Sequence, residues 1–210
     1  MSQQGITVVI PTLDRAEYAY QTVLDMLAQD FPAFEVLIVD QSDIENAQIK
    51  KLQPDASKQI NYYSVNFKGL PNARNFAWQK AKYDILLYVD DDIRCQPQLI
   101  KEHFRMFSDP NIGAVAGGIT EKTKASDAHQ PTGAFSYITA TSYRGYSREG
   151  EFEVEHFPGG NFSVRKALLQ QIGGFDENLN VGAALHEETD ASLSLKKQGV
   201  KIVPASHLLN

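Results

Sequence analysis

Short apolar runs alternate with amphipathic stretches over about the first 120 residues of the chain. Runs rich in β-branched and aliphatic residues predict strands at 6–10, 34–39, 60–65, 85–89 and 112–116. Helical spacing and helix start signals predict helices at 16–27, 72–82 and 97–107; the second begins after Pro71, with Asn72 as its cap. The alternation predicts an α/β fold, with helices on both faces of a mostly parallel, Rossmann-like central sheet.

The rest of the chain changes in character twice. Residues 120–155 are rich in Ser, Thr, Gly and Tyr with little periodicity, which predicts long loops with some short structure. They form a lid or an acceptor-facing segment, or else a variable surface insertion. Regular structure resumes at 157–164, followed by helices at 165–172 and 187–198 and a strand at 200–203. We expect one domain over 1–210, and its end close to a strand also suits a C-terminally truncated chain.

Polar residues end three of the predicted strands. Thr12 and Asp14 follow the first strand, Asp40 ends the second, and the aspartates 90–92 follow the run at 85–89. Ligands in parallel sheets bind beyond the carboxyl ends of the strands. We therefore expect these side chains to gather at one edge and to form a site there.

Composition narrows the class of protein. Hydrophobic residues make up 42% of the chain and charged residues 22%, as in ordinary globular domains. The single cysteine, Cys95, excludes an intramolecular disulfide and favours a reducing compartment. A formal net charge of -6 argues against a nucleic-acid partner. No apolar run is long enough to span a bilayer, so we expect a cytoplasmic protein, with peripheral contact at the inner face of the membrane left open.

Three consecutive aspartates at 90–92 are costly after a buried strand, because neighbouring carboxylates repel one another unless a cation neutralises them. Their hard oxygens suit Mg²⁺ or Mn²⁺, with water and phosphate oxygens completing the coordination. The alternative is a solvated turn that caps a helix. A calcium loop of the EF-hand kind is excluded, because Arg94 stands where an acid or asparagine is required.

Six segments form an ordered set of motifs: VVIPTLDR at 8–15, VLIVDQS at 36–42, GLPNARN at 69–75, YVDDD at 88–92, GGN at 159–161 with Arg165, and IGGFDE at 172–177. In this order they resemble the family 2 glycosyltransferases, which have the GT-A fold. The resemblance covers nearly the whole chain except about 120–155. It implies a nucleotide-binding half at about 1–118 and an acceptor-binding half at about 119–210.

The resemblance implies roles for the residues that follow the first two strands. Pro11 and Thr12 would line the nucleotide pocket, with Asp14 or Arg15 nearby. Asp40 would accept a hydrogen bond from the base, typically uracil, which has an N–H to donate. The alternative for Asp40 is the cap of a following helix.

Further roles follow from the later motifs. Arg74 would lie near the base or the phosphates, unless it forms a surface ion pair. Asp92 would be the direct metal ligand, with Asp90 as a second candidate that faces the ribose or sugar, and Asp91 would be a donor contact or a bystander. Glycines at 159–160 (Gly159, Gly160) would let the backbone approach the donor sugar or acceptor, unless they serve plain turn chemistry.

Inverting transfer needs a carboxylate that removes the proton of the acceptor hydroxyl. The resemblance places this base at the start of a late helix, where Glu188 stands in place of the usual Asp and Glu187 and Asp190 are rivals. Acids in a first helical turn also simply complement the helix dipole. His207 is a further candidate metal ligand, since the family often has a histidine after the final strand.

These features predict an inverting, metal-dependent glycosyltransferase that uses a nucleotide-sugar donor, most simply a UDP-sugar, and a saccharide or lipid-linked saccharide acceptor. Gln41 and Glu188 depart from the family pattern, which keeps open a binding module without turnover. A sugar-nucleotide nucleotidyltransferase is disfavoured, because 11–15 lack the glycines of its phosphate loop. A dehydrogenase is disfavoured too, because no G-x-G-x-x-G follows the first strand.

Overall fold

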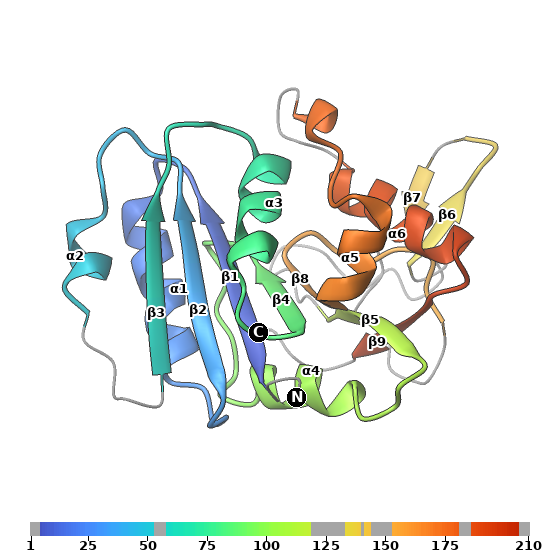
Figure 1. The fold of residues 1–210 in the computed structure, drawn as a ribbon, viewed down its shortest axis with the longest axis horizontal. Helices are drawn as coiled ribbons and strands as arrows, with labels where there is room; N and C mark the ends of the chain where they lie inside the picture. The colour runs from blue at the N-terminus through green and yellow to red at the C-terminus, as the bar shows by residue number, and fades with distance from the viewer. Residues whose placement is uncertain are drawn as a thin grey trace.

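The computed structural model describes residues 5–52, 58–118, 133–139, 141–143, 153–180 and 186–205. A seven-stranded sheet runs through them in the order β3-β2-β1-β4-β8-β5-β9 (Figure 1). Its strands are β1 (Ile6–Thr12), β2 (Phe34–Asp40), β3 (Lys58–Ser64), β4 (Ile85–Val89), β5 (Ile112–Gly117), β8 (Asn161–Arg165) and β9 (Lys201–Ala205). Neighbours pair in parallel except that β8 runs antiparallel to β4 and β5. The mostly parallel sheet predicted from the sequence is confirmed.

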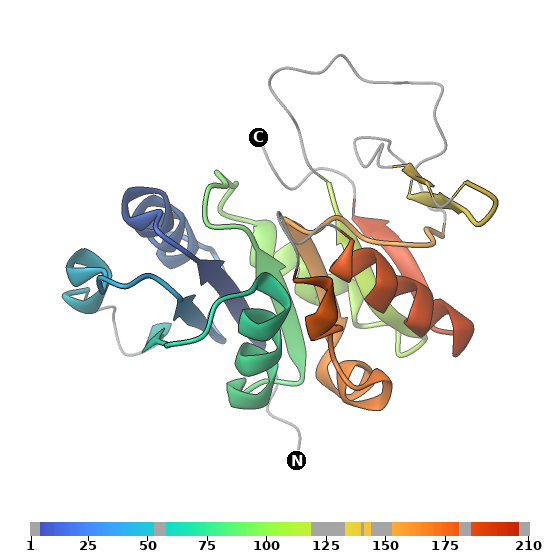
Figure 2. The same cartoon turned by 90° about the horizontal axis from the view of Figure 1, so that it is seen from above.

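Helices cover both faces of this sheet, as predicted (Figure 2). They are α1 (Ala16–Leu27), α2 (Ala47–Lys50), α3 (Leu70–Lys80), α4 (Leu99–Met106), α5 (Lys166–Ile172) and α6 (Glu187–Lys197), with a 3-10 turn η1 at Glu177–Leu179. Buried residues of α1 and α4 share one core layer, and those of α3, α5 and α6 share the other.

Alternation along the strands divides the core into these two layers. In β2, Val36 and Ile38 pack on the α1 side, whereas Leu37 and Val39 pack on the α3 side. Successive side chains of a strand point to opposite faces, so a strand that is covered on both faces is apolar throughout. This explains why the sequence shows continuous apolar runs here.

The first strand is longer than predicted. Pro11 and Thr12 belong to β1 and pair with Val39 and Asp40 of β2. The ladder between β1 and β4 ends at Val9, so Pro11 lies beyond the part of β1 that has neighbours on both sides. Proline, which lacks an N–H, is tolerated in such a position.

The predicted start of α3 is wrong by two residues. The helix begins at Leu70 with Gly69 at its N-cap, so Pro71 lies in the first turn. A missing N–H has no helical partner to lose in that turn. Asn72 is not the cap; its side chain donates to Oε2 of Glu177 at 2.8 Å.

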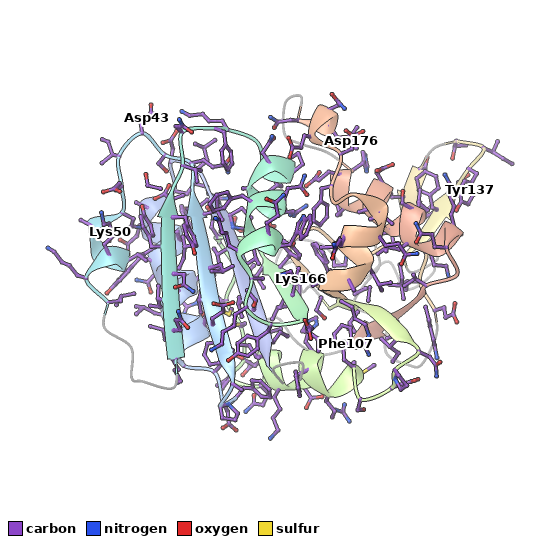
Figure 3. The ribbon with its side chains drawn as sticks, in the orientation of Figure 1. Asp43, Lys50, Phe107, Tyr137, Lys166 and Asp176 are labelled. Atoms are coloured by element: carbon purple, nitrogen blue, oxygen red, sulfur yellow. The ribbon has the colours of Figure 1, made fainter. Side chains whose placement is uncertain are left out.

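The segment 120–155 contains a short hairpin in its described part, β6 (Ala134–Ser136) with β7 (Thr141–Tyr143). Tyr137 in its turn is 65% exposed and lies at the opposite end of the molecule from Lys50 of α2 (Figure 3). The expectation of loops with short structure is confirmed for this part. Residues 119–132, 140 and 144–152 lie outside the described residues.

Candidate functional site

A hydrogen bond joins the end of β1 to the aspartate cluster that follows β4. The Thr12 hydroxyl donates to Oδ2 of Asp91 at 2.6 Å, and Arg15 Nη1 lies 2.9 Å from Oδ1. Thr22 of α1 donates to the backbone carbonyl of Asp91 at 2.8 Å. Burial raises the pKa of Asp91, while the Thr12 hydrogen bond and Arg15 oppose the rise. Both carboxylate oxygens of Asp91 have protein partners, which favours the bystander role.

Arg15 also binds the last aspartate of the cluster. Its Nη2 donates to Oδ2 of Asp92 at 2.5 Å, and this bond is the main reason that the pKa of Arg15 is raised. The side chains of Arg15 and Asp92 are 43% and 42% exposed. A ligand at this edge of the sheet can therefore reach both of them.

Asp40 lies on the same edge, paired in register with Thr12. Its Oδ1 accepts from the backbone N–H of Ser42 at 2.9 Å, and the Tyr62 hydroxyl donates to Oδ2 at 2.5 Å. Burial, and then this hydrogen bond, raise the pKa of Tyr62. Asp40 does not cap the following helix, because the side chain of Asn46 accepts from the first N–H groups of α2 instead.

Gln41 is a polar group that sequence analysis recorded only as a departure from the family pattern. It is 4% exposed, and its Oε1 has no hydrogen-bond partner among the described residues. Its backbone N–H donates to the Thr12 carbonyl at 3.0 Å, which continues the ladder between β1 and β2. By strand alternation its side chain lies on the α3 side, opposite to Asp40. Alternation predicts the side of the sheet on which Gln41 lies, but not that its Oε1 lacks a partner.

The loops after β1 and β2 are joined at the same edge. Asp14 has a φ of 55°, in the left-handed region that aspartate tolerates, and its N–H donates to the Ser42 hydroxyl at 2.7 Å. Asp14 is exposed and Pro11 is buried in β1. Asp43 of the second loop lies at the end of the molecule where β1, β2 and β3 end (Figure 3).

A second group of residues surrounds the glycine pair before β8. A Cβ atom on Gly160 would lie 2.6 Å from Oδ2 of Asp90, and a Cβ on Gly159 would lie 3.5 Å from Cδ of Glu188. Neither glycine has a positive φ, so turn conformation alone does not require them. The close approach of Asp90 is what requires glycine at 160.

The charge environment of Asp90 shows which groups face it. Burial is the main cause that raises the pKa of Asp90, and the charges of Asp92 and Glu188 raise it further. Arg74 and Arg15 oppose this rise. The Asp90 carboxylate is therefore close enough to interact electrostatically both with the Arg15–Asp92 pair and with Glu188 of α6.

Arg74 is buried, so the alternative of a surface ion pair is wrong. The residue is 1% exposed; its Nη1 pairs with Oε1 of Glu187 at 2.5 Å, and its Nη2 donates to the Gly159 carbonyl at 2.9 Å. Its Nε and Oε2 of Glu187 have no hydrogen-bond partner among the described residues.

The three acids at the start of α6 have different surroundings. Glu187 is 0% exposed and paired with Arg74; burial raises its pKa to about 7, with Arg74 opposing and Glu188 adding to the rise. Glu188 is 7% exposed and lies beside Gly159. Asp190 is exposed, and its pKa is raised by partial burial and by the charge of Asp176. Glu188 is therefore the acid of this helix that lies beside the glycine pair, near Asp90, and it has no ion pair with a basic residue in the described part of the chain.

Asn75, which follows Arg74 in the GLPNARN motif, holds the IGGFDE motif. Its Nδ2 donates to the Phe175 carbonyl at 2.8 Å and to Oε1 of Glu177 at 2.9 Å, and its Oδ1 accepts from the Phe175 N–H at 2.9 Å. Both motifs are visible in the sequence, but neither indicates a role for Asn75. The contact joins residues 100 positions apart, which no local signal shows.

The described residues contain no group of three or more His, Cys, Asp or Glu side chains arranged to hold a metal ion. This is compatible with Mg²⁺ or Mn²⁺, which proteins often bind through one or two carboxylates together with substrate phosphates. Asp92, with its exposed carboxylate, and Asp90 fit such a site. His207, the third predicted ligand, lies outside the described residues.

A mostly parallel sheet with polar strand ends, an aspartate cluster and a facing acid has the arrangement expected of glycosyltransferases with the GT-A fold. The model of the glycosyl transferase family 2 matches residues 7–173. The chain belongs to this family.

Individual proteins agree with this assignment. A glucosyl-dolichyl phosphate glucuronosyltransferase of Haloferax volcanii is 24% identical over 177 residues, which cover 82% of this chain and 56% of that protein. The structure of S. aureus TarS with UDP-GlcNAc superposes with a TM-score of 0.72 at 20% identity, covering 96% of this chain and 56% of that one. The mannosyltransferase PcManGT of Pyrobaculum calidifontis, solved with GDP-Man and Mn²⁺, gives 0.69 at 18% identity, covering 98% and 55%. The chain thus spans little more than half the length of these proteins.

Within the described residues, none of the helices has the length and apolar character that crossing a membrane requires.

Proposed function

We propose that this chain is the catalytic domain of an inverting glycosyltransferase, which moves a sugar from a nucleotide-diphosphate donor to an acceptor hydroxyl with the help of a divalent cation. The observation that carries this proposal is the approach of Asp90 and Glu188 to one glycine pair. The first acid follows β4 and the second lies in the first turn of α6. Family membership supplies the reaction class.

The donor is a UDP-linked hexose or N-acetylhexosamine in this proposal. TarS was solved with UDP-GlcNAc and PcManGT with GDP-Man, so the shared fold supports a nucleotide sugar without selecting the base. We place the base and ribose at the ends of β1 and β2, beside Pro11, Thr12, Asp40 and the buried oxygen of Gln41. The diphosphate would then lie beside Arg15, with Asp14 nearby, because a guanidinium suits phosphate oxygens.

The cation would be held by Asp92, with Asp90 as the second carboxylate. When bound, it stabilises the negative charge that develops on the leaving diphosphate. The Mn²⁺ in the PcManGT structure supports a divalent metal and does not distinguish Mn²⁺ from Mg²⁺.

Glu188 is the proposed base. Its carboxylate takes the proton of the acceptor hydroxyl as that oxygen bonds to the anomeric carbon, and the bond between this carbon and the diphosphate oxygen breaks. Attack opposite the leaving group inverts the anomeric configuration. Glu187 is committed to Arg74, and Asp190 is exposed and subject to the charge of Asp176, which supports Glu188 over both rivals.

The acceptor is a saccharide or a lipid-linked saccharide, bound by the half of the chain at about 119–210. The Haloferax relative is named for a lipid-linked sugar, glucosyl-dolichyl phosphate, which supports the second form. We accordingly propose a cytoplasmic enzyme that works at the inner face of a membrane.

The competing function is a sugar-nucleotide-binding module without turnover, which the departures at Gln41 and Glu188 favour. Titration of UDP with and without Mn²⁺, followed by an assay of UDP release from UDP-sugars, separates the two. Metal-dependent binding with UDP release that needs an acceptor supports the transferase. Metal-dependent binding without release across a panel of donors and acceptors would support the module.

A further inference from the structure

The buried guanidinium of Arg74 connects three segments that are far apart in the sequence. Arg74 belongs to α3, donates to the Gly159 carbonyl ahead of β8, and pairs with Glu187 at the start of α6. The Tyr88 hydroxyl of β4 donates to the backbone carbonyl of Arg74 at 3.3 Å, which ties this part of α3 to the sheet. In both views α3 and α6 lie on the same face of the sheet, with β8 beneath them (Figures 1 and 2).

Aromatic rings confine this guanidinium. Its Cζ lies 5.5 Å from the ring centroid of Phe162 and 5.6 Å from that of Phe175, which are distances for cation–π attraction. Asn75 fixes the Phe175 backbone through two hydrogen bonds. Because the Arg74 guanidinium is confined in this way, it fixes the positions of Glu187 and of the Gly159 carbonyl.

The ion pair between Arg74 and Glu187 uses only part of its hydrogen-bonding capacity. Nη1 meets Oε1, while Nε and Oε2 find no partner in the described part of the chain. Buried polar atoms without partners cost stability, and replacing a buried ion pair by apolar residues of similar size is often neutral or stabilising. Stability alone is therefore a weak reason for this pair, which points to a role in function.

The two partners of Arg74, Gly159 and Glu187, are sequence neighbours of Gly160 and of the proposed base Glu188. Gly159, whose carbonyl Arg74 holds, precedes Gly160, and Gly160 packs against Asp90. Glu187 directly precedes Glu188. A shift of Arg74 would therefore move Gly160 and Glu188 relative to Asp90.

We propose that Arg74 and Glu187 are positioning residues, which fix Glu188 and Gly160 against Asp90, and that Arg74 does not contact the donor. The inference rests on the proposed function of Glu188. A misplacement of about 1 Å in a catalytic constellation costs on the order of a hundredfold in rate. Donor affinity would be spared, because the groups assigned to the base and the diphosphate belong to β1, β2 and the loops that follow them. Asp92, the first ligand assigned to the cation, is bonded to Arg15 of the same region and not to Arg74.

The decisive variant is the double substitution Arg74→Met with Glu187→Leu, which removes both charges together. We expect a thermal midpoint close to that of the wild type, a donor KM within about threefold, and a kcat lower by roughly a hundredfold. Glu35→Gln is the matched control, because Glu35 is also a buried carboxylate, 2% exposed. It lies at the start of β2, at the end of the strand away from the proposed site, and accepts hydrogen bonds from Thr7 and Asn61. The kcat of this control should stay at the wild-type value.

Two kinetic outcomes would overturn the proposal. An unchanged kcat together with an unchanged donor KM makes the pair purely structural, whereas a donor KM raised well beyond threefold makes Arg74 a donor ligand. If the double variant does not fold, Arg74→Lys takes its place, because a single ammonium does not span Glu187 and Gly159 together. Its kcat should fall at constant donor KM, and the same two outcomes would again count against the proposal.

Hydrogen–deuterium exchange separates this inference from the proposed function. In either variant we expect faster exchange in segments 153–165 and 186–192, with β1 and β2 unchanged. This exchange result does not depend on activity. If the wild-type chain transfers no sugar, the proposed function is wrong, but faster exchange in these segments still supports the positioning role of Arg74 and Glu187. Unchanged exchange in both segments would refute the positioning role itself.

Discussion

Gly160 and Asp90 lie so close together that a side chain at position 160 would displace the Asp90 carboxylate. A Cβ atom there would lie 2.6 Å from Oδ2 of Asp90, and the backbone N–H of Asp90 points to the Gly160 carbonyl at 3.4 Å. The turn before β8 and the first aspartate of the cluster therefore form one unit. Since Glu188 lies beside the neighbouring Gly159, this unit connects the end of β4 with α6.

Gly160→Ala is expected to lower kcat by roughly tenfold or more, because the new methyl group displaces the Asp90 carboxylate. Overpacking should also lower the free energy of unfolding by about 1–3 kcal/mol. Gly159→Ala is the matched comparison, since its Cβ would meet Arg74 Nη2 and Glu188 Cδ at 3.4 and 3.5 Å, and its effect should be smaller. Steady-state kinetics and urea denaturation measure both. Equal losses in the two variants would contradict the importance of the Asp90 contact.

Asp92→Ala is expected to abolish metal-dependent UDP binding, because it removes the exposed carboxylate assigned to the cation. Calorimetric titration of UDP with and without Mn²⁺ measures this. Asp43→Ala is the control, since Asp43 is an acid at the same edge whose side chain is 85% exposed and paired with Lys68. Unchanged metal-dependent affinity in Asp92→Ala would rule out the assigned ligand.

Glu188→Gln is expected to retain donor binding and to lose turnover by at least about a hundredfold, as removal of a general base requires. Asp190→Asn, on the exposed side of the same turn, should change kcat little. Single-turnover assays with saturating donor measure the chemical step. Near-normal turnover in Glu188→Gln would transfer the base role to Glu187 or Asp190.

Gln41→Leu tests whether the buried amide oxygen serves the nucleotide. Leucine removes a polar atom that has no partner among the described residues, so the free energy of unfolding should stay the same or rise. UDP affinity should fall roughly tenfold or more, because a hydrogen bond from the base or ribose is lost. Asp40→Asn is the comparison for UDP affinity. Both oxygens of Asp40 already accept hydrogen bonds, from Ser42 and Tyr62, so this variant should lose less affinity than Gln41→Leu. A stable Gln41→Leu variant with wild-type UDP affinity would show that the oxygen has no ligand.

His103 predicts a pH dependence of stability. This fully buried histidine of α4 bonds to Ser163 and Asn161, and burial lowers its pKa to about 4 from an ordinary value of 6.5. Between these pH values the unfolded chain binds a proton and the folded chain does not, so stability falls as the pH decreases from 6.5 to 4. The loss attributable to His103 is roughly 3 kcal/mol.

Urea denaturation of the wild type and His103→Gln over this pH range measures the effect. The variant should lack this part of the slope, whereas His186→Gln, at the exposed N-cap of α6, should retain it. Identical slopes in the wild type and His103→Gln would contradict the assignment to His103.

The strands and helices of the first half were predictable because their side chains carry the signal locally. β4 is buried on both faces and appears in the sequence as an unbroken apolar run, and β2 is apolar without a break from Val36 to Val39. The errors lie at the ends of elements, where Pro11 remains in its strand and Pro71 lies inside its helix. Proline breaks regular structure only where its missing N–H has a partner to lose, and that depends on neighbours which the sequence does not name.

The meeting of polar strand ends was predictable from the sequence, and their contacts were less so. Thr12, Asp40 and the cluster at 90–92 meet at one end of the sheet, as expected. The surroundings of Arg74 were not predictable, because its partners Gly159 and Glu187 lie 85 and 113 positions away. That Oε1 of Gln41 has no hydrogen-bond partner among the described residues was not predictable either, because this depends on the side chains that the fold places around it.

The sequence by itself determined the α/β class, the end of the sheet at which the polar strand ends meet, and the resemblance to the family, because periodicity and short motifs act over a few residues. Tertiary structure alone decided which acid lies beside the glycine pair, which is paired with an arginine, and which is exposed. Glu187, Glu188 and Asp190 occupy one helical turn and look alike in sequence. Their differences arise from burial and from charges that other segments bring to them, and these depend on the packing of the whole chain.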